Sequence, residues 1–129
     1  MFTIDQIQAA HSKVKSGADF PVYIQDLIAL GVTKYDTFVI DGHSLFYGND
    51  GYKVESNPKY GGLSVLSSSK QEQFVNRLKL HQQGGTDYST FCQDAADNGV
   101  EKWTVDTASM TCNYFDKSGN LILAEKIPA

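Results

Sequence analysis

The pair of residues best suited to chemistry is a carboxylate and an imidazole two positions apart. Asp41 and His43 flank Gly42, between two segments rich in β-branched and aromatic residues. If this stretch is extended, both side chains point to one face, where Asp41 could orient His43 as a general base and raise its pKa. The ordinary alternative is an Asp that caps its own turn beside a partly exposed His. We favour this alternative, because Asp-Gly turns are common.

Cys112 is the third candidate for catalysis, since a thiol near His43 would form a Cys–His pair. A shift of 68 positions, however, aligns Cys112 with Ser44 and not with His43. The thiol and the imidazole are therefore expected to face opposite sides of equivalent strands. We interpret Cys112 as a small buried residue, and Cys92 in the same way, because free cysteines usually pack in cores.

Aromatic and histidine side chains supply the candidates for ligand binding. Tyr60 precedes two glycines in an irregular segment, where a mobile ring could close over a small ligand or could simply belong to a linker. Tyr47 and Trp103 lie in predicted strands, where aromatic rings commonly pack within a sheet. His11 and His81 lie beside the apolar stripes of predicted helices and could approach a cleft, although such histidines more often mark the margin of a core.

No residue spacing points to a metal or a cofactor. The three histidines and two cysteines are scattered, without C-x-x-C or H-x-x-x-H spacing. The patterns of a phosphate-binding loop, a nucleophile elbow and a zinc protease are also absent. We therefore expect neither a metal nor a cofactor.

Two similar halves position these candidates. Residues 19–54 align with residues 87–122 at the constant shift of 68, without gaps. The aligned aromatic pairs are Phe20 with Tyr88, Tyr23 with Phe91, Tyr35 with Trp103, Phe46 with Tyr114 and Tyr47 with Phe115. Helix capping alone would explain Asp19 with Asp87, but no local rule requires Lys34 to match Lys102. An internal duplication accounts for the alignment better than convergence of local signals.

Each half is predicted to contain two helices followed by three strands. Apolar periodicity and turn signals place helices at 3–15, 19–31, 69–83 and 87–98, and strands at 32–40, 43–47, 52–55, 100–106, 109–115 and 120–127. Capping boxes are expected at Thr3–Gln6 and Ser69–Glu72, and a short strand at about 63–66. This order predicts an α+β fold, in which four helices cover one face of an antiparallel sheet. We expect one domain over 1–129, with pseudo-symmetric halves at about 1–55 and 69–127 and a connector at 56–68.

Composition restricts the partners. The chain has 129 residues and a net charge of −4, so it lacks the basic face that nucleic acid binding requires. Its apolar stretches are shorter than the roughly 20 residues of a membrane helix. The N-terminal segment has no basic start followed by an apolar core, so we expect no secretory signal, a cytoplasmic location and reduced cysteines.

Three longer stretches carry a family resemblance: HSKVKSGADFPVYIQDLIALGV, FVIDGHSLFYG and GVEKWTVDTASMTCNYFDKSGN. Through them the chain resembles, over nearly its whole length, a family of small uncharacterised bacterial proteins. Its members contain a domain of unknown function and are often labelled phage envelope protein. The resemblance implies no activity and no catalytic residues.

These observations leave three hypotheses of function. The leading one is a non-enzymatic module that binds a small molecule or a protein segment between the halves or on the free sheet face. The second is a small hydrolase or transferase, with His43 as general base oriented by Asp41. The third is a phage-derived or structural protein that self-associates, because an exposed strand edge would permit a homodimer.

Overall fold

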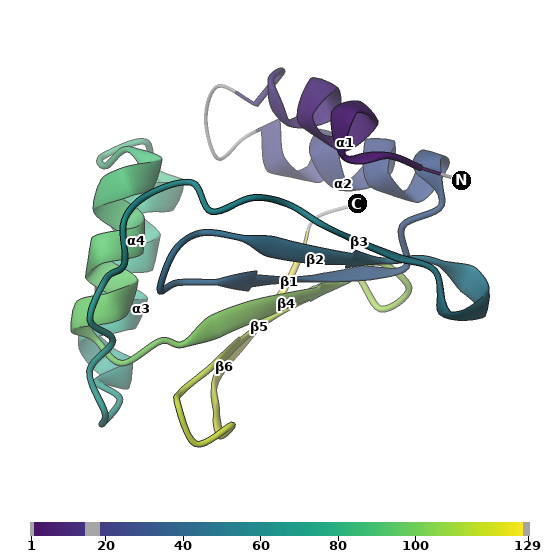
Figure 1. Cartoon of the computed structure of the whole chain (residues 1–129). Helices are drawn as coiled ribbons and strands as arrows, with labels where there is room; N and C mark the ends of the chain where they lie inside the picture. Colours follow the sequence, from purple (N-terminus) through teal and green to yellow (C-terminus); the bar gives the residue numbers. More distant parts are fainter. Residues whose placement is uncertain (1, 15–18, 128–129) are drawn as a thin grey trace.

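The computed structural model describes residues 2–14 and 19–127. Within these residues the chain forms an α+β domain of four α-helices and a six-stranded antiparallel sheet (Figure 1). The elements are α1 (Ile4–His11), α2 (Phe20–Leu30), β1 (Lys34–Phe38), β2 (Ser44–Tyr47), the short 3₁₀ turn η2 (Asn49–Gly51), β3 (Lys53–Glu55), α3 (Gln71–Gln82), α4 (Tyr88–Asp97), β4 (Lys102–Asp106), β5 (Thr111–Phe115) and β6 (Leu121–Lys126). The predicted fold class and order of elements are confirmed.

The two three-stranded meanders join edge to edge in one sheet. The strand order is β3-β2-β1-β4-β5-β6, so β1 and β4 pair at the centre. Asp36 lies opposite Thr104 in this central ladder, and Thr104 Oγ1 donates a hydrogen bond of 2.5 Å to Asp36 Oδ1. The ladders on either side share a register at the shift of 68: Thr37 pairs with Ser44, and Val105 pairs with Cys112.

Local sequence signals predicted some helix ends correctly, whereas other predicted helix ends were wrong. The capping box of Thr3 and Gln6 is confirmed, and Asp87 accepts a hydrogen bond from the Thr90 N–H. The equivalent Asp19 makes no capping hydrogen bond. The first helix ends at His11 and not at 15; the predicted stop at 16–17 lies outside the described residues.

The connector accounts for two wrong predictions. Helix α3 begins after Lys70 without a side-chain cap, so Ser69 and Glu72 form no capping box. The Lys70 N–H donates to Asn98 O, which fixes the start of α3 from outside the helix. Residues 63–66 form no strand, because Leu63 and Leu66 donate to different segments, at Ile40 O and Ala96 O, and no ladder can form.

The helices lie over one face of the sheet as two separate pairs, α1 with α2 and α3 with α4 (Figure 1). Alternate strand residues point toward them: Tyr35, Thr37, Ser44 and Phe46 in the first half, and Trp103, Val105, Cys112 and Tyr114 in the second. The other face carries partly exposed rings interleaved with polar residues. The side chains between the helix pairs therefore face a space that the sheet closes from below.

Candidate functional site: a cleft between the helix pairs

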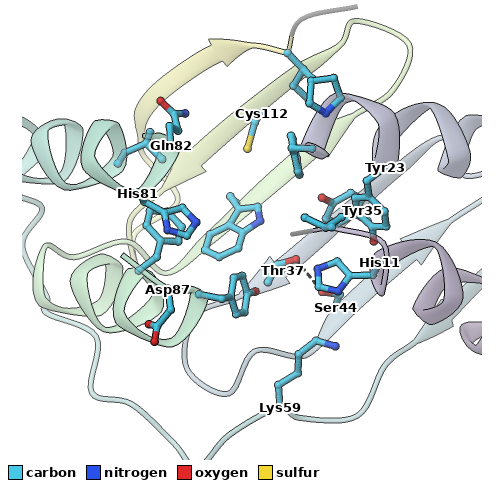
Figure 2. A pocket seen from close by; sticks show the side chains of 18 of the residues that line it. His11, Tyr23, Tyr35, Thr37, Ser44, Lys59, His81, Gln82, Asp87 and Cys112 are labelled. Carbon is cyan, nitrogen blue, oxygen red and sulfur yellow. Dashed lines mark hydrogen bonds between the residues drawn. The ribbon is translucent and has the colours of Figure 1, made fainter. Parts of the chain in front are cut away.

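A cleft of about 1330 Å³ separates the two helix pairs, with the sheet as its floor (Figure 2). His11 and Tyr23 line it from α1 and α2, and His81 and Phe91 line it from α3 and α4. The floor is aromatic and consists of Tyr35, Phe46, Trp103 and Tyr114. A volume of this size exceeds that of most small-molecule pockets, so the cleft has room for an organic ligand and its water.

Two ladders of rings connect the walls of the cleft to its floor. In the first ladder, the ring centroids of His11 and Tyr23, Tyr23 and Tyr35, and Tyr35 and Phe46 are 5.2, 6.4 and 5.1 Å apart. In the second ladder, those of His81 and Phe91, Phe91 and Trp103, and Trp103 and Tyr114 are 4.5, 5.6 and 6.1 Å apart. Such ring pairs stabilise a fold by about 0.5–1.5 kcal/mol each beyond simple burial. The ladders thus hold each helix pair against its own half of the sheet.

Several polar atoms in this aromatic surface have no partner. Among residues 2–14 and 19–127, Tyr23 Oη, Tyr35 Oη and Trp103 Nε1 form no hydrogen bond, although the three side chains are only 6%, 4% and 7% exposed. In this part of the chain, every polar side-chain atom that is fully shielded from solvent has a hydrogen-bond partner. The three atoms therefore open into the cleft. Burial raises the pKa of both tyrosines, so their hydroxyls remain protonated and able to donate.

A cluster of hydroxyls lies at one end of the floor. Thr37 Oγ1 and Ser44 Oγ are 2.8 Å apart, and the Ser44 N–H donates to Ser56 Oγ, also at 2.8 Å. Lys59 lines the cleft beside this cluster, with its side chain directed toward His11 and Ser44 (Figure 2). Burial and then the charge of Lys59 lower the pKa of His11, so His11 is a neutral imidazole at pH 7.

His81 faces the cleft from the opposite wall, and its Nδ1 is held by Thr86. Its Nδ1 lies 3.1 Å from Thr86 O, and a carbonyl oxygen can only accept a hydrogen bond. Nδ1 also lies 3.0 Å from Thr86 Oγ1, a hydroxyl that can either donate or accept. Its ring stacks on Phe91 with 15° between the planes, which fixes its orientation.

Cys112 lies on the cleft floor and is not an activated nucleophile. Burial raises the pKa of its thiol to about 12, against a weaker opposing effect of a hydrogen bond with Tyr114. The thiolate, which is the reactive form, is therefore scarce near neutral pH. Cys112 occupies the place of Ser44 in the equivalent strand and faces the helices, as its alignment predicts. Both Cys112 and Cys92 are free and buried.

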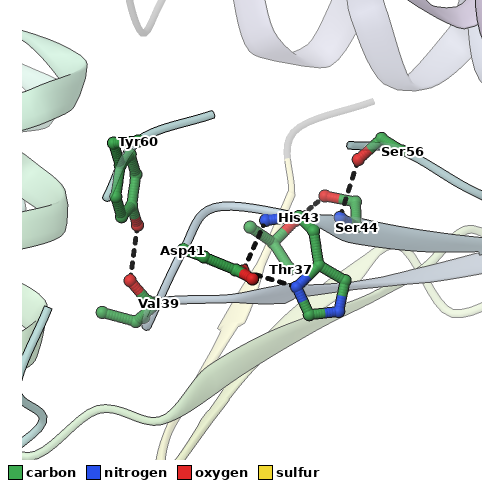
Figure 3. Close-up of polar contacts among 7 residues, drawn as sticks. All are labelled: Thr37, Val39, Asp41, His43, Ser44, Ser56 and Tyr60. Carbon is green, nitrogen blue, oxygen red and sulfur yellow. Dashed lines mark hydrogen bonds and ion pairs between the residues drawn. The ribbon is translucent and has the colours of Figure 1, made fainter. Parts of the chain in front are cut away.

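Asp41 and His43 contact each other outside the cleft (Figure 3). Asp41 Oδ1 lies 2.5 Å from His43 Nδ1 and accepts a second hydrogen bond of 3.0 Å from the His43 N–H. Slight burial acts to raise the pKa of Asp41, but these hydrogen bonds and the imidazole charge outweigh it and hold the pKa below its ordinary value. The His43 ring stacks on Phe38, on the face away from the helices. The structure thus brings Asp41 and His43 together but separates both from Cys112.

The turn at Asp41 also anchors the connector. The Lys59 N–H donates to Asp41 O at 2.8 Å, and Tyr60 Oη donates to Val39 O at 2.5 Å (Figure 3). Gly42 has φ +76°, and a Cβ there would lie 2.7 Å from the Tyr60 ring. Tyr60 is therefore fastened to the turn, and the backbone bond places Lys59 at the end of the cleft.

Of the three ligand-binding candidates, only Trp103 lines the cleft. Tyr47 alternates with Phe46 and lies on the other face, with Lys34 Nζ 4.9 Å from its ring centroid. The sequence interpretation missed Tyr23, Tyr35 and Phe91 as site residues. Their signal was present in the alignment of the two halves, where aromatic residues match aromatic residues.

The fold and the cleft define a class: an α+β domain whose six-stranded antiparallel sheet supports an aromatic cleft between two helix pairs. Residues 8–126 match the family described as "Protein of unknown function (DUF1398)", and the chain belongs to this family. Its description names no activity and neither phage nor envelope. No curated protein matches the sequence.

Two kinds of feature are absent from the described part of the chain. None of its helices has the length and apolar character needed to cross a membrane. Nor do three or more His, Cys, Asp or Glu side chains gather there in a group that could hold a metal ion.

Proposed function

We propose that the protein binds a small organic molecule in the cleft between its helix pairs. The observation that carries this proposal is the combination of a roomy aromatic cleft with Tyr35 and Trp103, whose polar atoms open into the cleft without a protein partner. A ligand that accepts from these groups forms direct hydrogen bonds in place of bonds to water. Its rings pack on the ladders and bury apolar surface as well.

Binding without turnover fits the chemistry of the cleft best. The thiol of Cys112 is held protonated, as described above. Within the described residues, neither His11 nor His81 forms an ion pair with a carboxylate that would orient it as a base. A carboxylate partner would orient such a base and raise its pKa, whereas a binding module needs none.

We also propose that the two halves arose by duplication and that each contributes half of the binding surface. Three of the four rings in each ladder correspond at the shift of 68. In support, β1 pairs with β2 in the same register as β4 with β5, and Asp36 lies opposite its own counterpart, Thr104. Two similar half-sites facing each other suit a flat ligand that contacts both walls.

Filling the cleft is expected to abolish binding of flat aromatic fragments. Gln8 is an exposed residue of α1 that lines the cleft, whereas its neighbour Ala9 is exposed and does not. We expect Gln8→Phe to weaken binding at least about tenfold, because the new ring occupies ligand space, and Ala9→Phe to leave it unchanged. The emission of Trp103, the single tryptophan, reports binding directly. Equal binding by both variants, or no quenching by any fragment, would contradict the proposal.

A second candidate function is a small hydrolase or transferase with His43 as general base. The hydrogen bond of 2.5 Å between Asp41 Oδ1 and His43 Nδ1 favours it, since Asp41 then leaves His43 Nε2 to accept a proton. His43→Gln should remove turnover of ester and phosphoester substrates by a factor of roughly 100 or more, while the unfolding midpoint changes little. Turnover equal to that of the unaltered protein would eliminate the role of His43.

A further inference from the structure

We infer that the ligand of the cleft is a planar aromatic molecule carrying one carboxylate, which binds at the Lys59 end. This inference rests on the proposed binding function and adds the chemical class and the orientation of the ligand. Charged side chains are distributed unevenly along the cleft. Lys59 and His11 lie at one end. Two acidic residues also line the cleft: Asp87 is the N-cap of α4, and Glu125 lies on β6.

The ammonium of Lys59 is available to a ligand. In the part of the chain that the structure describes, Lys59 forms no ion pair. The two acidic groups are already engaged, since Asp87 Oδ1 accepts from the Thr90 N–H at 2.8 Å and Glu125 Oε1 accepts from Gln82 Nε2 at 3.1 Å. Lys126, the other lysine of the lining, stands on β6 at the second-half side. The Lys59 end is therefore the place where an added negative charge meets a free cation and no carboxylate.

The groups around Lys59 suit a carboxylate in particular. Thr37 and Ser44 share one hydrogen bond between their hydroxyls, which leaves one hydroxyl hydrogen free to turn toward a ligand. His11 is neutral at pH 7 and can donate from one ring nitrogen. One cation with two neutral donors matches a group of single charge. A phosphate, with up to two charges, would leave one of them unbalanced.

The rest of the cleft defines the body of the ligand. Trp103 lies opposite Thr37 of the hydroxyl cluster and pairs in turn with Tyr114, while Tyr35 and Phe46 form the neighbouring row of the floor. None of these four side chains is charged. Flat rings stack well on such a surface. Trp103 Nε1 and Tyr35 Oη then offer donors to an acceptor on the ring system.

The backbone of Lys59 is held in place, whereas its side chain is exposed. Its N–H is bonded to Asp41 O, and the next residue, Tyr60, is bonded to Val39 O. The turn that the sequence suggested as a catalytic site thus holds the recognition residue at the end of the cleft. Because the backbone is already fixed, only the side chain of Lys59 has to be ordered on binding.

Isothermal titration calorimetry with three probes on one ring system tests this inference. The probes are naphthoate, the uncharged naphthamide and the corresponding naphthylmethylammonium. We expect naphthoate to bind at least about tenfold more tightly than naphthamide, and the ammonium to bind most weakly. Lys59→Gln should remove the preference for naphthoate, and Lys59→Arg should keep most of it. Lys53→Gln is the matched control, because Lys53 is exposed on β3 and does not line the cleft.

Four results would overturn the inference, and they separate it from the proposed function. Equal affinity for naphthoate and naphthamide, with binding still lost in Gln8→Phe, rejects the carboxylate but keeps the cleft as a binding site. Preference for the ammonium assigns recognition to Asp87 and Glu125 instead. No binding of any probe rejects both the inference and the proposed function. A preference for naphthoate that survives Lys59→Gln rejects Lys59 as its source.

Discussion

Replacing Gly99 with alanine is expected to destabilise the protein by at least about 3 kcal/mol. Gly99 has φ +81°, a left-handed conformation that costs a residue with a Cβ about 1–2 kcal/mol. A Cβ at this position would also lie 2.6 Å from Ser68 O and 2.8 Å from Ser69 Cα. Both are backbone atoms, which cannot turn aside as a side chain would. Urea denaturation monitored by Trp103 emission measures the loss.

Gly119 provides the matched control for Gly99. It has φ +84° in the turn between β5 and β6, but no atom lies within 4 Å of the position its Cβ would take. Gly119→Ala should therefore cost only the backbone strain, about 1–2 kcal/mol. If the two alanine variants lost equal stability, the close contact between Gly99 and the connector would have no energetic role.

Phe74→Ala is expected to cost about 3–5 kcal/mol. Phe74 is fully buried in α3, with its ring centroid 5.0 Å from that of Tyr114 and 6.0 Å from that of Phe91. Removing the ring leaves a cavity directly behind the second ladder, so the lost burial and the lost packing add. The free energy of unfolding of the variant, from the same urea experiment, gives the cost.

Phe38 allows the same substitution in a different environment. It is only partly buried, on the face of the sheet away from the helices, and stacks on His43 at 4.5 Å. Phe38→Ala should cost about 1 kcal/mol, because the site is open to solvent and leaves no closed cavity. A loss as large as that of Phe74→Ala would show that the outer face is covered in solution.

Sequence patterns predicted the strands better than the ends of the helices. Strand residues such as Tyr35 and Trp103 were placed correctly, because β-branched and aromatic runs are strong local signals. The start of α3 was not, because a hydrogen bond between Lys70 and Asn98, distant in sequence, sets it. The predicted strand at 63–66 failed for the same reason, since its two backbone donors bind different segments.

The site was predictable only in part. The alternation of side chains along a strand correctly predicted that Cys112 and His43 lie apart, because this alternation is a local geometric rule. The cleft itself depends on where the helix pairs sit over the sheet, and no local pattern encodes that distance. Asp41 illustrates the limit: its closeness to His43 followed from spacing, but its role in fastening Lys59 depends on the path of the connector.

The helices pack mainly against the partner within their own pair. Each helix pair is held to its own strands by its own ring ladder, and the halves meet through the ladder of β1 and β4. The distance between the two helix pairs therefore depends on the twist and curvature of the sheet and on the size of the side chains on the cleft floor. Substitutions on the cleft floor can therefore widen or narrow the cleft for ligands of different size. The packing within each helix pair would not change.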